Sequence, residues 1–273
     1  MTKFFRHLLI CALITCTTAS YAQITLSSEV DSSAKTAPKR VVPKRPKPID
    51  REFSVGARLN TDGWSLFADK GYVMSEEKES EKFYNIRLFQ LEITEHRHAK
   101  EIKGTNTGGY IGEKPRPYKF GKVNSFYALK LGYGFRKLLA GKPDPGTVSI
   151  HWVYGGGLSV GFLKPYYLDI YHANNEGPQP TRYQDEPDMF LTMSRIAGRS
   201  GFFEGIGQTK IVPGIHAKTA LHFDFAAFRK RKLAIETGLN AELYTQKIEL
   251  MALVKSYPFL LNGYIAVQFG NRK

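Results

Sequence analysis

Apolar and polar residues alternate with a period of two along most of the chain from Glu52 onward. On a pleated strand this period sends successive side chains to opposite faces of the sheet. In residues 126–136 one face carries Tyr127, Leu129, Leu131, Tyr133 and Phe135, and the other carries Ala128, Lys130, Gly132, Gly134 and Arg136. Burying charges and glycines in the dry core of a β-sandwich would be energetically unfavourable. The same residues suit the inside of a narrow barrel whose outside faces lipid. The pattern therefore predicts transmembrane β-strands.

The same alternation predicts about eight strands. It recurs in residues 83–95, 148–162, 215–225, 233–243 and 261–269. Residues 53–59 and 64–68 read as a hairpin around the turn residues 60–63, with one bulged strand as the alternative. We expect an all-β fold, an antiparallel up-and-down transmembrane β-barrel over residues 52–273.

The lengths of the connections support this topology. If the first strand rises from the periplasm, the short connections 140–146 and 226–231 lie on the periplasmic side. The long connections 96–122, 164–210 and 245–258 then all lie outside, which is the asymmetry of outer-membrane barrels. Only the charged stretch 69–82 departs from the rule.

The first 22 residues have the pattern of a secretory signal. Lys3 and Arg6 precede a short apolar run, and Ser20 and Ala22 stand three and one before the expected cut. An alternative cut places Cys16 first, as an acylated residue of a lipoprotein. Both cysteines, Cys11 and Cys16, lie in this leader, so cleavage after Ala22 leaves a chain without thiols.

Residues 23–51 are rich in proline and basic residues and offer little to bury. Seven Lys or Arg and one Asp give residues 35–51 a charge of +6, within a total of +14. Such a segment stays extended and solvated. We expect a disordered periplasmic spacer; contact of residues 35–51 with the cell wall or a secretion complex is the alternative. An exported basic protein meets anionic lipid and lipopolysaccharide, so we expect these as partners, no nucleic acid, and a monomer.

Over residues 52–269 the chain resembles small Gram-negative outer-membrane β-barrel proteins of the OmpA and OmpX type, through alternation and topology. It also resembles the PorT-like barrel proteins of a secretion and gliding apparatus. Barrels of this class often end on an aromatic residue that the assembly machinery recognises, whereas here Phe269 is followed by four more residues. Aromatic residues near the strand ends predict two interfacial belts. The expected outer belt holds Phe126, Tyr127, Tyr166, Tyr167, Tyr257 and Phe259, and the expected inner belt holds Phe135, Phe223, Phe225, Phe228 and Phe269.

An eight-stranded barrel has room inside only for its own side chains, so inward charges must pair with one another. We predict a structural ion-pair network in the lumen, formed by Lys130, Arg136, Lys218, Asp224, Glu236 and Glu242. A conducting pore is the alternative.

The sequence contains weaker hints of other chemistry. The inward histidines His151, His216 and His222 suggest acid–base catalysis, yet no serine stands at a spacing that would mark it as a nucleophile. His96 with His98, and the acidic loop residues 185–188, are possible metal ligands but do not make a site by themselves. We expect no catalytic, cofactor-binding or metal-binding residues and no cofactor.

The predicted function is a non-enzymatic outer-membrane barrel, localised by its cleaved signal, that anchors long extracellular loops for contact with a partner, a ligand or lipopolysaccharide. The alternatives are a lipid-modifying barrel enzyme, a component of a secretion apparatus, and a soluble exported barrel that carries an apolar ligand.

Overall fold

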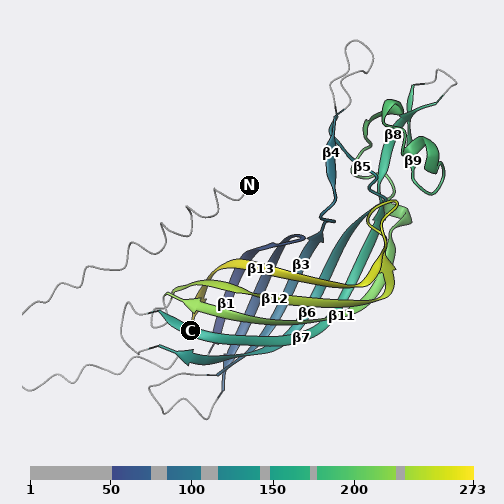
Figure 1. Cartoon of the computed structure of the whole chain (residues 1–273). Helices are drawn as coiled ribbons and strands as arrows, with labels where there is room; N and C mark the ends of the chain where they lie inside the picture. The colour runs from purple at the N-terminus through teal and green to yellow at the C-terminus, as the bar shows by residue number, and fades with distance from the viewer. Residues whose placement is uncertain (1–50, 75–84, 106–115, 142–147, 173–176, 226–230) are drawn as a thin grey trace, which may run out of the picture. The chain divides into compact units, whose positions relative to one another are not determined.

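The main feature of the protein is a closed β-barrel, seen in a computed structural model that describes residues 51–74, 85–105, 116–141, 148–172, 177–225 and 231–273 (Figure 1). Its eight strands are β1 (Arg51–Asn60), β2 (Gly63–Val73), β3 (Ile86–His96), β6 (Asn124–Ala140), β7 (Ser149–Pro165), β11 (Lys210–Asp224), β12 (Arg231–Ile248) and β13 (Tyr257–Arg272). Each pairs antiparallel with its neighbours in chain order, and β1 pairs with β13 to close the barrel. The predicted all-β barrel of eight strands is confirmed.

The N-terminal part of the barrel is a hairpin, as predicted, and not one bulged strand. Strands β1 and β2 are joined by two residues, Thr61 and Asp62, and Asn60 pairs with Gly63. The predicted signal peptide and most of the predicted basic segment lie outside the described residues. Arg51, the last residue of that predicted segment, is the first residue of β1.

The two faces of each strand differ in chemistry as the alternation predicted. On β6 and β7 the outward side chains Leu131 and Leu158 are 59% and 67% exposed, whereas the inward Lys130 and Ser159 are buried. The apolar faces of all eight strands therefore point away from the lumen. Exposing these faces to water would be unfavourable, whereas exposing them to lipid would not. The chain is a membrane-spanning barrel, and the soluble carrier with an apolar interior is excluded.

The connections at the two ends of the barrel differ. The two longest, 97–123 and 166–209, lie with 249–256 and the 61–62 turn at one end, here called the loop end. The third connection expected to be long, 245–258, is shortened to 249–256, because β12 extends to Ile248 and β13 begins at Tyr257. The other end, here called the terminal end, holds both ends of the described chain and the connections 74–85, 141–148 and 225–230. No helix in the described residues is long and apolar enough to cross a membrane.

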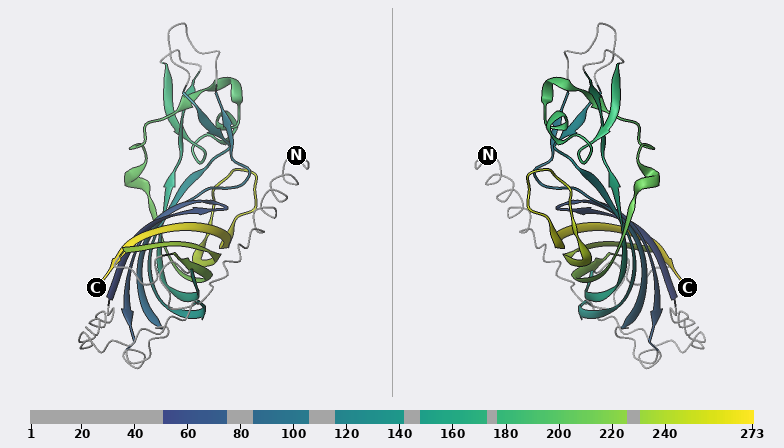
Figure 2. Two further views of the ribbon diagram at one scale, coloured as in Figure 1. Left: turned by 90° about the vertical axis from the view of Figure 1, so that its left-hand side faces the viewer. Right: turned by 90° about the vertical axis from the view of Figure 1, so that its right-hand side faces the viewer.

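The long connections contain a folded unit, here called the loop lobe, where the sequence indicated only loops. It is formed by the three-stranded sheet of β8 (Tyr167–Tyr171), β9 (Pro178–Arg182) and β10 (Ile196–Arg199), the pair β4 (Ile102–Gly104) and β5 (Tyr118–Phe120), and the short helices α2 (Pro187–Phe190), η2 (Met193–Arg195) and η3 (Ile206–Gln208). Leu168, Ile170, Phe190 and Ile196 are fully buried in its core. The lobe lies beyond the loop end of the barrel in all three ribbon views (Figures 1 and 2).

Backbone hydrogen bonds join connections 97–123, 166–209 and 249–256 where they leave the barrel. The amide of Tyr166 donates to Val123 (2.9 Å), and the amide of Val123 donates to Leu250 (2.9 Å). The amide of Ala252 donates to Gly121 (2.7 Å). These bonds tie the three connections to one another next to the ends of the barrel strands.

Glycines allow β6 and β7 to approach closely inside the barrel. A Cβ added to Gly134 would lie 2.6 Å from the carbonyl oxygen of Tyr154, and one added to Gly155 would lie 2.6 Å from the Cα of Gly134. Any side chain at these inward positions would push the two backbones apart. The glycines therefore permit the strand curvature that a narrow barrel needs.

Candidate functional site

The structure places all six charged residues predicted for the lumen inside the barrel. Lys218 Nζ lies 3.6 Å from Glu236 Oε1, and Lys130 contacts the carboxylate of Glu242. Arg136 and Asp224 instead pair with two residues that the sequence analysis did not select, Glu52 and Arg272.

The lumen contains six further charged residues on the same inward faces. In the described part of the barrel the cations are Arg58, Lys130, Arg136, Lys218, Lys232 and Arg272, and the anions are Glu52, Asp69, Glu92, Asp224, Glu236 and Glu242. The six cations and six anions balance. This matters because a buried charge without a partner of opposite sign is strongly destabilising. Extending the alternation by one residue at Glu52 and Lys232, and by three at Arg272, would have found these charges.

Charge is most concentrated at the terminal end, around the carboxylate of Glu52. Glu52 is 3% exposed and binds three cations: Arg136, Lys232 (3.0 Å) and Arg272 (3.4 Å). These residues come from β1, β6, β12 and β13. The cluster thus ties the first strand to strands across the barrel.

Apolar side chains close the lumen at the loop end. Phe126 is fully buried, with its ring 5.0 Å from that of Tyr244 and 5.6 Å from that of His96. Leu163, Val212 and Ile248 complete the cluster. A cavity beneath it, lined by residues that include Gln90 and His216, has a volume of about 10 Å³, which is the space of one water molecule.

Two aromatic residues expected in the outer belt are therefore misplaced. Phe126 points into the lumen and Tyr166 is buried against the loop lobe. Tyr257 and Phe259 do face outward, and Phe228 lies outside the described residues. The two tryptophans, which the belts had not included, also face outward: Trp64 lies near the loop end and Trp152 near the terminal end.

The possible metal ligands do not converge. His96 is buried and contacts Asp62 (2.7 Å) and Glu242 (3.3 Å), whereas His98 lies beyond the end of β3 and accepts a hydrogen bond from the amide of Lys100 (3.1 Å). In the loop lobe, Asp185 pairs with an arginine and Glu186 with a histidine. In the described residues no group of three or more potential ligands forms a metal site.

One serine–histidine pair escaped the sequence analysis. Ser159 Oγ lies 2.9 Å from His216 Nδ1 in the lumen. The two residues are inward on adjacent strands but 57 positions apart, so no local motif marks them. Both are buried, and the cavity that His216 lines has a volume of only about 10 Å³, too small for a lipid substrate.

A hollow lies on the outside of the barrel at the loop end and is here called the rim pocket. It has a volume of about 240 Å³. Its floor is the outer face of β3, β6 and β7, where Glu95 pairs with Tyr127 and Ser125 pairs with Lys164. Residues of the loop lobe form its other walls: Lys103, Tyr118, Lys119, Tyr166, Tyr167, Arg199 and Phe202.

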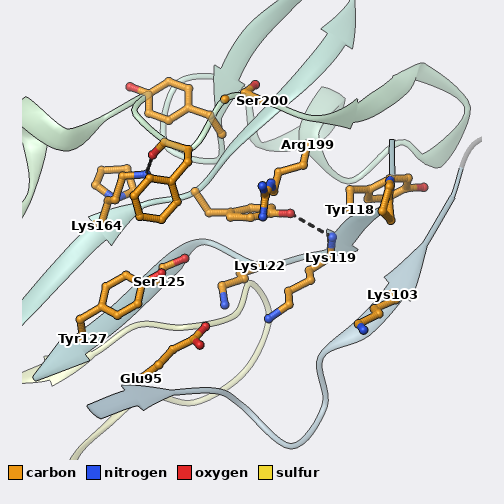
Figure 3. Close-up of a pocket in the computed structure, with 16 residues that line it drawn as sticks. Glu95, Lys103, Tyr118, Lys119, Lys122, Ser125, Tyr127, Lys164, Arg199 and Ser200 are labelled. Carbon is orange, nitrogen blue, oxygen red and sulfur yellow. Dashed lines mark hydrogen bonds between the residues drawn. The ribbon is translucent and has the colours of Figure 1, made fainter. Parts of the chain in front are cut away.

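The rim pocket is strongly basic. Lys103, Lys119, Lys122, Lys164 and Arg199 line it, against one carboxylate, Glu95. Figure 3 shows these side chains distributed around the hollow, on the barrel and on several segments of the lobe.

Two of these cations share a carboxylate at the edge of the rim pocket. Glu101 binds Lys119 and Lys122, the latter at 2.7 Å. Burial lowers the pKa of Lys122 to about 8, and the hydrogen bond to Glu101 opposes this shift. Burial raises the pKa of Glu101, but its hydrogen bonds from the two lysines outweigh burial and leave that pKa below its usual value. Both groups are therefore charged at neutral pH.

Comparison with known proteins gives similarity of structure only. No protein-family description and no curated protein matches the chain. Among solved structures it is similar to Neisserial surface protein A (7% identity, TM-score 0.35, covering 82% of this chain and 96% of that one). It is also similar to the N-terminal β-barrel domain of Pseudomonas aeruginosa OprF (10%, 0.29, 81% and 96%) and to a major outer membrane protein from Thermus thermophilus (11%, 0.35, 80% and 99%). The closed eight-stranded barrel of this chain is the architecture that the sequence resemblance to outer-membrane barrels implied.

Proposed function

We propose that the chain is an integral outer-membrane protein without enzymatic activity, whose barrel anchors the loop lobe at the cell surface for contact with a partner, a ligand or lipopolysaccharide. The observation that carries this proposal is the separation of roles within the fold. The lumen is filled by its own balanced charges, whereas the lobe has a separate core and the rim pocket beside it. A barrel that conducts nothing and supports a folded lobe acts as an anchor.

The outer-membrane location is supported by the signal-like first 22 residues and by the apolar exterior of the barrel. Only helices and closed barrels satisfy all backbone hydrogen bonds within a bilayer. The two longest connections, 97–123 and 166–209, leave the same end of the barrel and carry the lobe, which favours an orientation with the lobe outside.

Cysteine labelling tests both location and orientation, because the only cysteines of the chain lie in the predicted leader. Ser194→Cys puts a thiol on the exposed surface of the lobe, and Lys273→Cys puts one at the terminal end. In intact cells a membrane-impermeant maleimide should label Ser194→Cys alone, and after permeabilisation it should label both. Recovery of the protein in the soluble fraction, or labelling of Lys273→Cys alone in intact cells, would contradict the proposal.

A lipid-modifying enzyme is the second candidate, and the Ser159–His216 pair is the observation in its favour. A nucleophile and a base at hydrogen-bond distance are the start of a catalytic pair. The pair is enclosed, however, whereas lipid lies on the outside of the barrel. Overexpression of the wild type and of Ser159→Ala separates the candidates: an enzyme alters membrane lipid composition in a serine-dependent way, and an anchor alters it in neither case.

A further inference from the structure

The rim pocket lies where the lipid-facing wall of the barrel ends. Directly below its floor, on the same outward faces of β3 and β6, follow Ile93 and Leu129, and Val160 continues the surface on β7. Ile93 is 54% exposed, so this wall is open to acyl chains. The pocket thus occupies the level of lipid headgroups at the loop end of the barrel.

The pocket has more positive charge than its own carboxylates neutralise. Glu95 is already bound by Arg97 (2.7 Å) and by the indole nitrogen of Trp64 (2.6 Å), and Glu101 is shared by Lys119 and Lys122. In the described residues no carboxylate lies within ion-pair distance of Lys103 or Arg199. Arginine and lysine with free donors are the usual partners of phosphate oxygens.

Exposed apolar side chains flank the pocket on its lobe side. Phe202 lines it and is 53% exposed, and the adjacent Phe203 is 81% exposed. The Lys164 ammonium lies 4.8 Å from the centre of the Phe202 ring and donates a hydrogen bond to the carbonyl oxygen of Phe202. Aromatic rings next to cations are typical of the headgroup zone of a membrane.

We infer that the rim pocket binds the phosphorylated headgroup of a membrane lipid, with its acyl chains along the outer face of β3, β6 and β7. Lys103 and Arg199, which bind no carboxylate among the described residues, can donate to the phosphate oxygens, while Lys119, Lys122 and Lys164 add positive charge around them. The phenols of Tyr118 and Tyr127 can donate further hydrogen bonds. This inference rests on the proposed membrane-spanning function and names the chemical class of ligand for its surface.

The test uses the mature protein in an uncharged, non-phosphorus detergent, with a short-chain phosphatidic acid as the probe. Inorganic phosphate and a diacylglycerol of the same chain length are the two comparison ligands. Trp64 reports binding through its fluorescence, because its indole donates to Glu95 in the pocket floor. Phosphatidic acid should bind at least about tenfold more tightly than either comparison ligand, because it alone combines the charge with the apolar contact.

Two double variants distinguish binding in the rim pocket from a general attraction of the lipid to a basic surface. Lys103→Gln/Arg199→Gln removes two pocket cations that are exposed and bind no carboxylate in the described residues, so the fold is retained. Lys100→Gln/Arg195→Gln removes two exposed cations that do not line the pocket. We expect the first to weaken phosphatidic acid binding about tenfold or more and the second to leave it unchanged.

Three results would overturn the inference: equal affinity of the pocket variant and the wild type, an equal loss in the control variant, or binding of inorganic phosphate as tight as that of the lipid. The last result would indicate an anion site that does not involve the membrane. The same variants and the wild type are also tested for membrane insertion, by whether heating changes the mobility of the membrane-extracted protein on a gel. If the wild type inserts but one of the three results above is found, the pocket alone is refuted; failure of the wild type to insert refutes the proposed function.

Discussion

Replacing Glu52 by glutamine should strongly destabilise the barrel. The amide keeps the size of the side chain but removes the negative charge that faces Arg136, Lys232 and Arg272. The lumen then holds six cations and five anions. Removing one partner of a buried ion pair costs about 3–5 kcal/mol, because the remaining charge stays desolvated. We therefore expect the free energy of unfolding of Glu52→Gln to fall by about 3–5 kcal/mol.

Guanidinium unfolding in lipid vesicles, followed by the fluorescence of the two tryptophans, measures this loss. The double variant Glu52→Gln/Lys232→Met restores the balance of charge at five and five, with an apolar chain of similar length at position 232. It should recover at least about 1 kcal/mol relative to the single variant. The control Glu249→Gln removes an exposed carboxylate and should stay within about 0.5 kcal/mol of the wild type. An unchanged midpoint for Glu52→Gln, or no recovery in the double variant, would refute the argument from charge balance.

Three further predictions concern the exterior, the close strand contact and the rim. Lipids brominated in their acyl chains should quench the fluorescence of both Trp64 and Trp152, because both face outward; an unquenched protein would contradict the lipid-facing exterior. Gly134→Ala should lower the folding yield, since its Cβ would lie 2.6 Å from a backbone oxygen of β7, whereas Gly207→Ala, with nothing within 4 Å, should fold normally. Burial lowers the pKa of Lys122 from 10.5 to about 8, so between these values the unfolded chain binds more protons and the folded protein gains stability as pH rises. The stability of the wild type relative to Lys122→Met, measured across that window, should increase with pH, and a flat or falling difference would count against this pKa shift.

The alternation predicted the strands and their faces because it is a local property of the sequence. Lys130 and Leu131 are neighbours, and a pleated strand sends them to opposite sides whatever they pair with. The ion-pair partners of the inward charges, in contrast, lie far away in the sequence. Arg136 meets Glu52 from 84 residues away, and Arg272 meets it from 220. Only the closed strand order, with its fixed register, brings these residues together.

The loop lobe and the rim pocket escaped prediction for a related reason. The core of the lobe uses single apolar residues from short strands and turns, such as Leu168, Phe190 and Ile196, and five residues of strand are too few for a clear period. The pocket cations come from β4, β5, β7 and β10, and from Lys122 just before β6. Their sequence neighbours give no sign that they share one hollow.

The balance of charge inside the barrel also bears on where the protein meets other molecules. Six cations and six anions fill the lumen together with buried aromatic rings, and Phe126 and Tyr244 close it at the loop end. A solute would have to displace these paired charges, each of which costs several kcal/mol to separate from its partner. We therefore expect any recognition to take place on the exterior, where the described residues form an apolar wall and, beside the lobe, the basic rim pocket.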